Sequence, residues 1–276
     1  MLKTTIMGES RMTHATLSRP MSSGRPTSNP ARSMEMAAVL FAFSLLSLAE
    51  GVFAYDFTLS DREFAGWPKW CQELYVTMDV GRRSPFVARI SRDAAERART
   101  NPQLNGFWHY CAGMVWLERA RAVPDPGRAD YMYRKTIDET SFNYALTPSG
   151  HFLRGDMGAT LGLAYRGVRE YDKAMEFLEK AIREEPAHPQ SYTAMYLVLR
   201  DLGRNDEARE ILIRGNEATK GKSAELHYFL GLAYVDAGDA ASARKHADQA
   251  YRLGYPLPGL KNKLDRLEAA NRAKTE

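Results

Sequence analysis

The strongest constraint in this sequence is an internal repeat. Three segments of the 276-residue chain, covering 155–188, 189–222 and 224–257, align without gaps. Each segment contains two stretches of roughly a dozen residues whose apolar side chains recur at helical spacing. One such helix pair cannot bury its apolar face alone, so the copies have to stack side by side. The repeat therefore predicts an all-α chain built from antiparallel helix pairs.

Small and aromatic side chains recur at equivalent places of the repeats. Those of the first repeat are Leu161, Gly162, Tyr165, Ala174, Ala181 and Pro186. Those of the third repeat are Leu230, Gly231, Tyr234, Gly238, Ala243 and Ala250. Because Gly162 and Ala174 have almost no side chain, two helices can cross closely there, and Pro186 ends the second helix. Gly203 and Gly238 suit the tight turn between the paired helices.

These residues and the spacing of the repeats resemble the tetratricopeptide repeat family, whose unit has 34 residues. The resemblance implies an α-solenoid of antiparallel helix pairs over residues 150–257. The second repeat departs from the family pattern, with Tyr196 in place of a small Gly, Gly215 in place of an Ala, and Lys220 in place of the closing Pro. We expect the helix pair of this repeat to pack more loosely or to be shifted.

Helical patterns continue on the C-terminal and the immediate N-terminal side of the three repeats. Within 106–149, Gly113 and Trp116 have the spacing of a repeat's Gly and Tyr, which predicts a degenerate repeat with its second helix near 129–137. Residues 258–276 are predicted to form a capping helix with a polar outer face, followed by a tail. Such caps keep a solenoid soluble.

Residues 55–105 are predicted to form an N-terminal helical cap or a diverged repeat. Ser60 and Glu63 have the spacing of a capping box, in which each side chain bonds the other's backbone N–H. Pro68 suits the first turn of a helix that follows. A second helix is expected over residues 85–99.

The first 54 residues are predicted to lie outside the fold, because residues 1–33 are polar and lack apolar periodicity. An apolar run, AAVLFAFSLLSLA, extends from Ala37 to Ala49, and small side chains near Ala54 suit cleavage of a secretory signal. The run is shorter than the ~20 residues that span a membrane. We expect a periplasmic or secreted mature protein that begins at Tyr55, with an uncleaved membrane anchor as the alternative.

Composition limits the kinds of partner and chemistry. Lys and Arg number 38 and Asp and Glu 34, and this net charge of +4 is too small to indicate nucleic-acid binding. The six His are scattered, and the zinc-protease motif H-E-x-x-H is absent from the sequence. We therefore expect no metal, no cofactor and no enzymatic activity.

A concave groove is the candidate functional site. In the resembled family, side chains of the first helices line this groove, and the places that match here are Leu163, Arg166, Thr193, Leu197, Arg200, Tyr228 and Leu232. The three leucines are predicted to form an apolar ridge, and Arg166 or Arg200 to meet an acidic group of a partner. The alternative is that the ridge packs against other parts of this chain.

The region with Cys71 and Cys111 gives a second hypothesis. In an oxidising compartment the two cysteines are a candidate disulfide, and otherwise they are two buried free thiols. With His109 they could belong to a thiol-redox or enzymatic accessory, although no C-x-x-C motif occurs. The surrounding aromatic residues are predicted to pack in the core rather than to form a ligand platform. They are Trp67, Trp70, Tyr75, Phe107, Trp108, Tyr110 and Trp116.

The sequence thus favours an exported, non-enzymatic scaffold that holds a protein or peptide segment in its groove, with a role in envelope assembly or secretion. The assignment to those processes is an analogy at the level of the fold.

Overall fold

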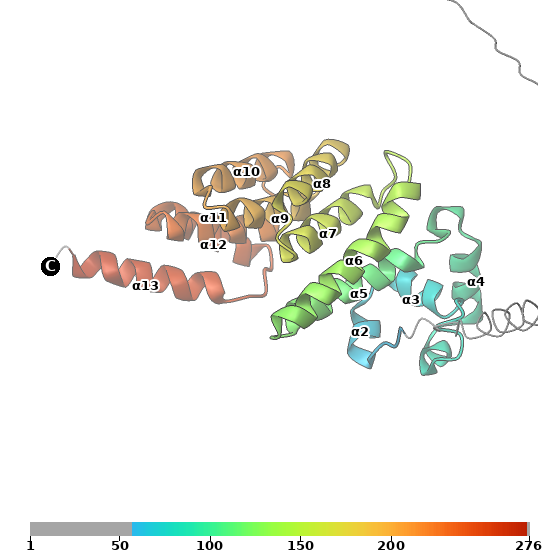
Figure 1. Cartoon of the computed structure of the whole chain (residues 1–276). Coiled ribbons are helices and arrows are strands. Elements are labelled where there is room, and N and C mark those ends of the chain that lie inside the picture. The colour runs from blue at the N-terminus through green and yellow to red at the C-terminus, as the bar shows by residue number, and fades with distance from the viewer. Residues whose placement is uncertain (1–56, 275–276) are drawn as a thin grey trace, which may run out of the picture. The chain divides into compact units, whose positions relative to one another are not determined.

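The computed structural model describes residues 57–274, and all regular structure in that range is helical (Figure 1). The expected secretory signal and polar N-terminal region lie outside the described residues. Within the described range, no helix is both long and apolar enough to cross a membrane.

The helices before the repeats are short. They are α2 (Asp61–Gly66), α3 (Lys69–Tyr75), the 3-10 helix η2 (Pro85–Arg89), α4 (Arg92–Thr100) and the 3-10 helix η3 (Pro102–Leu104). Longer helices then follow in pairs. They are α5 (Trp108–Ala122), α6 (Pro126–Leu146), α7 (Arg154–Gly167), α8 (Tyr171–Glu184), α9 (Pro189–Asp201), α10 (Asn205–Ala218), α11 (Ala224–Asp236) and α12 (Ala240–Arg252). The last helix is α13 (Gly259–Ala273).

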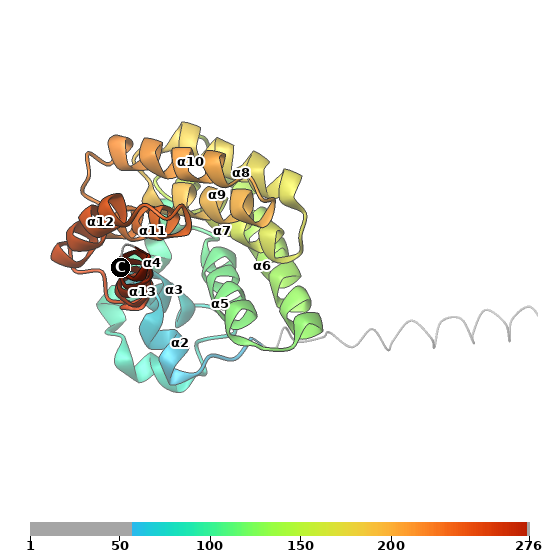
Figure 2. The same cartoon turned by 90° about the vertical axis from the view of Figure 1, so that its left-hand side faces the viewer.

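The helix pairs form two layers, as Figure 2 shows. The first helices of the pairs, α5, α7, α9 and α11, lie on the inner side, and α6, α8, α10 and α12 lie on the outer side. Each first helix contacts its own partner and the first helix of the next pair. The predicted solenoid of helix pairs is confirmed.

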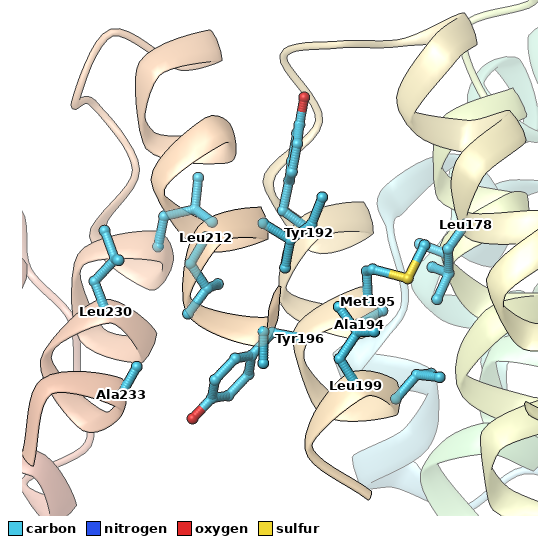
Figure 3. Close-up of a cluster of buried hydrophobic side chains, with 14 of the residues drawn as sticks. Leu178, Tyr192, Ala194, Met195, Tyr196, Leu199, Leu212, Leu230 and Ala233 are labelled. Carbon is cyan, nitrogen blue, oxygen red and sulfur yellow. The ribbon is translucent and has the colours of Figure 1, made fainter. Parts of the chain in front are cut away.

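The largest buried cluster links the repeats to one another. It joins Leu178 of α8, Tyr196 of α9, Leu212 of α10 and Leu230 of α11, all between 0 and 1 % exposed (Figure 3). The cluster crosses repeat boundaries, so each pair buries its apolar face against its neighbours, as a stacked array requires.

Glycine allows close approach of the paired helices in the first repeat. A Cβ added to Gly162 would lie 2.4 Å from Cγ of Leu178 on the partner helix. The turns between the helices also match expectation, because Gly203 and Gly238 have φ of 72° and 77°. The equivalent place in the first repeat has Arg169, with φ of 62°.

Packing explains the two unusual residues of the second repeat, Tyr196 and Gly215. Tyr196 fills the place of a small residue with a buried ring, which packs edge-to-face on Phe229 at 5.6 Å. Gly215 is small because the Tyr192 ring covers it, and an added Cβ would lie 2.6 Å from Cγ of that ring. Helices α9 and α10 approach each other less closely along their length than the other two pairs do, because the Tyr196 ring lies where a small residue is expected, and the side chains between them are buried.

Two predicted helix boundaries are wrong. The helix expected over 85–99 is divided into η2 and α4, because Ile90 is extended and the Ser91 side chain caps a new helix by accepting from the backbone N–H of Ala94. The helix expected near 129–137 is α6, which runs from Pro126 to Leu146. By contrast, the capping box of Ser60 and Glu63 is present as predicted, at the start of α2.

The capping helix at the C-terminal end lies where the sequence predicts it. Leu260 and Leu264 of α13 are fully buried against α11 and α12, in a cluster that includes Ala247. The outer side of α13 is polar and exposed. This helix covers the apolar face that the third repeat would otherwise expose to water.

Candidate functional site

A cavity of about 910 Å³ lies on the inner face of the helix pairs. Its lining residues come from α2, α5, α7, α9 and α11 and from the loop before α13. We call this cavity the groove. Its volume falls within the ~300–1,000 Å³ typical of ligand sites, and it is large enough for several side chains of a polypeptide.

The groove contains an apolar floor contributed by successive first helices. Met114 of α5, Leu163 of α7 and Leu197 of α9 line it, and both leucines stay partly exposed. Thr193 and Arg166 also line it, so four of the seven residues predicted for the groove lie there. An apolar floor open to solvent is the surface on which a partner's apolar side chains can be buried.

The third repeat does not take part in the ridge as predicted. Tyr228 is 8 % exposed and stacks on Tyr255 with ring centroids 4.1 Å apart. Leu232 packs within the cluster of α12 and α13. The alternative, that the ridge packs against other parts of the chain, applies to Tyr228 of this repeat, whereas Leu232 stays partly exposed but does not line the groove.

The arginines predicted to meet a partner are paired within the chain. Arg166 Nε lies 2.7 Å from Asp201 Oδ2, and Arg200 Nη2 lies 3.3 Å from Asp236 Oδ2. The first ion pair joins the C-terminal end of α7 to that of α9, and the second joins the C-terminal end of α9 to that of α11. Arg200 also does not line the groove. The expectation that either arginine stays available for an acidic group is corrected by these ion pairs.

A second wall of the groove comes from the N-terminal elements. Glu63 of α2 and Trp67 and Pro68, which follow α2, face the cavity. Cys71 and Cys111 form a disulfide that links α3 to α5, with Cα atoms 5.8 Å apart. The Trp67 Nε1–H donates to the carbonyl oxygen of Cys111 at 3.0 Å. The wall is thus attached covalently to the helix that faces it.

An ion pair joins the same wall to α5 nearer to solvent. Arg119 Nε lies 2.5 Å from Glu63 Oε1, and Nη2 donates to Glu63 Oε2 at 3.0 Å and to the carbonyl oxygen of Thr58. The hydrogen bond from Arg119 holds the pKa of Glu63 at about 2, below its ordinary 4.5, against the opposing effect of burial. This carboxylate therefore stays charged and paired at neutral pH.

Two carboxylates on the groove have no Lys or Arg partner within the described part of the chain. Asp156 Oδ1 lies 2.9 Å from His188 Nε2, and Nδ1 of that imidazole lies 2.8 Å from the Ser191 hydroxyl. Because Ser191 is fully buried, this trio positions side chains and does not present a nucleophile. Glu225 accepts from the Thr193 hydroxyl at 2.9 Å, and burial raises its pKa.

The aromatic and cysteine-containing region is mainly core. Cys71 and Cys111 are 0 % and 1 % exposed and are bonded to each other, so they are not free thiols in this structure. His109 pairs with Glu139 at 2.6 Å rather than with a cysteine. Trp67 and Tyr110 reach the groove from this core. Among residues 57–274 there is no cluster of three or more side chains suited to a metal ion.

The sequence analysis missed the contributions of α5 and α2. Transferring the groove places from the first repeat to α5, by aligning Gly113 with Gly162, would have selected Tyr110, Met114 and Leu117, which all line the groove. No comparable pattern in the sequence predicts that α2 contributes a wall of the groove. Its place depends on the disulfide and on packing between segments far apart in sequence.

The fold and the site define a class: a repeat protein whose stacked helix pairs present a concave groove. A family model described as tetratricopeptide repeat matches residues 159–188. The chain therefore contains a tetratricopeptide repeat at these residues. A comparison with curated proteins found no match.

Solved structures of tetratricopeptide repeat proteins are similar to this chain. TTC0263, a thermophilic TPR protein of Thermus thermophilus, is 18% identical, with a TM-score of 0.42 over 59% of this chain and 91% of that one. YrrB, described as a TPR protein with an unusual peptide-binding site, is 17% identical, with a TM-score of 0.38 over 62% and 78%. A MamA structure is 21% identical, with a TM-score of 0.38 over 58% and 87%. These values carry no functional argument.

Proposed function

We propose that this protein is an exported scaffold that holds a polypeptide segment of a partner in the groove. The observation that carries the proposal is the apolar floor of Met114, Leu163 and Leu197, which three successive first helices present to an open cavity of about 910 Å³. A concave site with an apolar floor and a few polar side chains around it is typical of a binding site.

The export part of the proposal has its own support. Structural disulfides persist in oxidising compartments, and Cys71–Cys111 is a buried disulfide between two elements. The sequence before the fold contains the apolar run expected of a secretory signal. An exported scaffold of this kind serves in envelope assembly or secretion. Intact mass of the protein from its own cells tests export, because a chain that begins at Tyr55 is expected and an uncleaved chain contradicts it.

Photo-crosslinking in cells that produce the protein tests groove binding. A photoreactive residue at Leu197 is expected to give a discrete adduct, since Leu197 is partly exposed on the groove floor. The same residue at Leu232 is the matched control, because this leucine has the equivalent repeat position and is also partly exposed but does not line the groove. Adducts of equal yield at both positions, or none at Leu197 and Leu163, would contradict the proposal.

A further inference from the structure

One end of the groove combines acidic and aromatic side chains. Asp156, Glu225, Phe229 and Tyr255 all line the cavity there. Glu225 and Tyr255 lie close enough that the carboxylate contributes to raising the pKa of the tyrosine to about 12, a shift caused mainly by burial. We call these four residues the acid–aromatic end.

The charges that line the groove do not cancel at this end. Three of its arginines have acidic partners in the chain: Arg119 pairs with Glu63, Arg121 with Glu118 at 3.1 Å, and Arg166 with Asp201. Those pairs leave Arg62 at the exposed rim and two carboxylates, Asp156 and Glu225, at the acid–aromatic end. Arg121 and His188 act on Glu225 from nearby, but no Lys or Arg of the described residues forms an ion pair with either carboxylate, so the negative charge at that end is only partly compensated.

Glu225 is the more buried and less compensated carboxylate of the two. Its described bond comes from a neutral hydroxyl, that of Thr193, and burial raises its pKa more than the neighbouring His188 and Arg121 lower it. A partly buried carboxylate without a cationic partner costs free energy, and an incoming cation supplies the missing partner. Aromatic faces beside it add a cation–π attraction.

We infer that the groove recognises a polypeptide segment that places a basic side chain, Lys or Arg, at the acid–aromatic end, beside an apolar residue on the floor. This inference rests on the proposed function and specifies the partner of the same groove. Glu225 and Asp156 are the acceptors for the cation, and Leu197 is the apolar contact.

The geometry also gives the spacing of the two recognised residues. Leu197 lies one helical turn after Thr193, whose hydroxyl is bonded to Glu225. One turn advances about 5–6 Å along a helix. An extended chain covers this in about two residues. The segment therefore has its basic residue about two positions from the apolar one.

Selection of phage-displayed random peptides on the full chain tests the inference. We expect enriched peptides to contain Lys or Arg about two positions from an apolar residue. Replacing that Lys or Arg by Ala in a synthetic peptide is expected to weaken binding to the wild-type protein by about tenfold or more, as for loss of a charge-assisted hydrogen bond. On Glu225→Gln the same replacement is expected to weaken binding clearly less than on the wild-type protein, because Asp156 is then the one remaining acceptor of the two.

Two variants separate the inference from the proposed function. Glu210→Gln is the control for overall charge, since Glu210 is exposed on α10 and does not line the groove, and this variant is expected to keep the preference for a basic residue. Leu197→Asp is expected to abolish binding of every selected peptide. Circular dichroism verifies that each variant is folded, and Glu225→Gln keeps an acceptor for the Thr193 hydroxyl.

The outcomes are distinguishable. Peptides that bind in a Leu197-dependent way without a basic residue, or with an acidic one, overturn the inference and leave groove binding standing. Peptides that bind equally well to Leu197→Asp lie outside the groove and overturn both. An equal loss of the basic preference in Glu210→Gln and Glu225→Gln would show that overall charge causes the effect, and this result also overturns the inference.

Discussion

Single residues decide how well each repeat fits its turn. Arg169 has φ of 62°, in the left-handed region where the second and third repeats have Gly203 and Gly238. A residue with a Cβ is strained there, and Gly is not. The first repeat therefore has a local cost that the other two avoid.

Arg169→Gly is expected to stabilise the protein by about 0.5–1 kcal/mol, because the relief of strain exceeds the added flexibility of the unfolded chain. Arg169 is exposed, so the change removes little packing. Thermal or urea unfolding measures the effect. The reverse change, Gly203→Arg, is the control and is expected to destabilise by a similar amount. A destabilised Arg169→Gly variant would contradict the strain argument.

At the scale of helices, the sequence predicts the features that follow from the repeat pattern. It does not predict the features that depend on contacts between segments far apart in the chain. The helix pairs of the three repeats follow from local periodicity, and Leu163 and Leu197 follow from their repeat positions. Leu232 has the same position, yet it packs beside α12 and α13 and does not line the groove, and its repeat position alone does not predict this. The break between η2 and α4 depends on a single cap at Ser91.

The pair α11 and α12 contains two histidines in contact. His227 Nδ1 lies 2.9 Å from His246 Nδ1, so one imidazole donates to the other. Burial, followed by the neighbouring His227, lowers the pKa of His246 from 6.5 to about 4. Burial also lowers the pKa of His227, and Arg252 and Lys245 contribute to this.

These lowered pKa values predict that acid weakens the last repeat. Below pH 6.5 the unfolded chain binds protons that the folded His246 does not, so stability is lost as the pH falls from 6.5 through about 4. His246→Phe keeps the stacked ring on Tyr234 and removes this titration. Thermal unfolding is measured at several pH values in this range. As the pH falls, the free energy of unfolding is expected to decrease by roughly 1 kcal/mol less in the variant than in the wild type, after allowance for partial exposure. Identical pH slopes would contradict the assignment.

At the scale of residues 57–274, the groove has two walls of different origin. The inner helices of the repeats form one wall by stacking, and the elements around α2 form the other, held by the disulfide and by Glu63–Arg119. Removal of the disulfide therefore affects the second wall first.

The double variant Cys71→Ala and Cys111→Ala is expected to lose about 2–4 kcal/mol of stability. Hydrogen exchange should increase in residues 57–76, while α7 to α12 keep their protection, because each repeat depends on its nearest neighbours. Peptides selected on the wild-type groove should bind more weakly. A uniform loss of protection over all helices, or none in residues 57–76, would contradict a wall that depends on the disulfide.

The disulfide also makes the folded part respond unequally to mechanical force. A pull on the chain from its two ends peels α13 and the last helix pairs away one at a time, because non-covalent packing alone holds them. The loop closed by Cys71 and Cys111, with a sequence separation of 40, cannot extend until the bond is reduced. That withholds about 140 Å of contour length, at roughly 3.3–3.6 Å per residue. The segment between Cys71 and Cys111 is therefore the part that the bond keeps closed, whereas the wall residues before Cys71 and the C-terminal repeats are held by non-covalent packing alone.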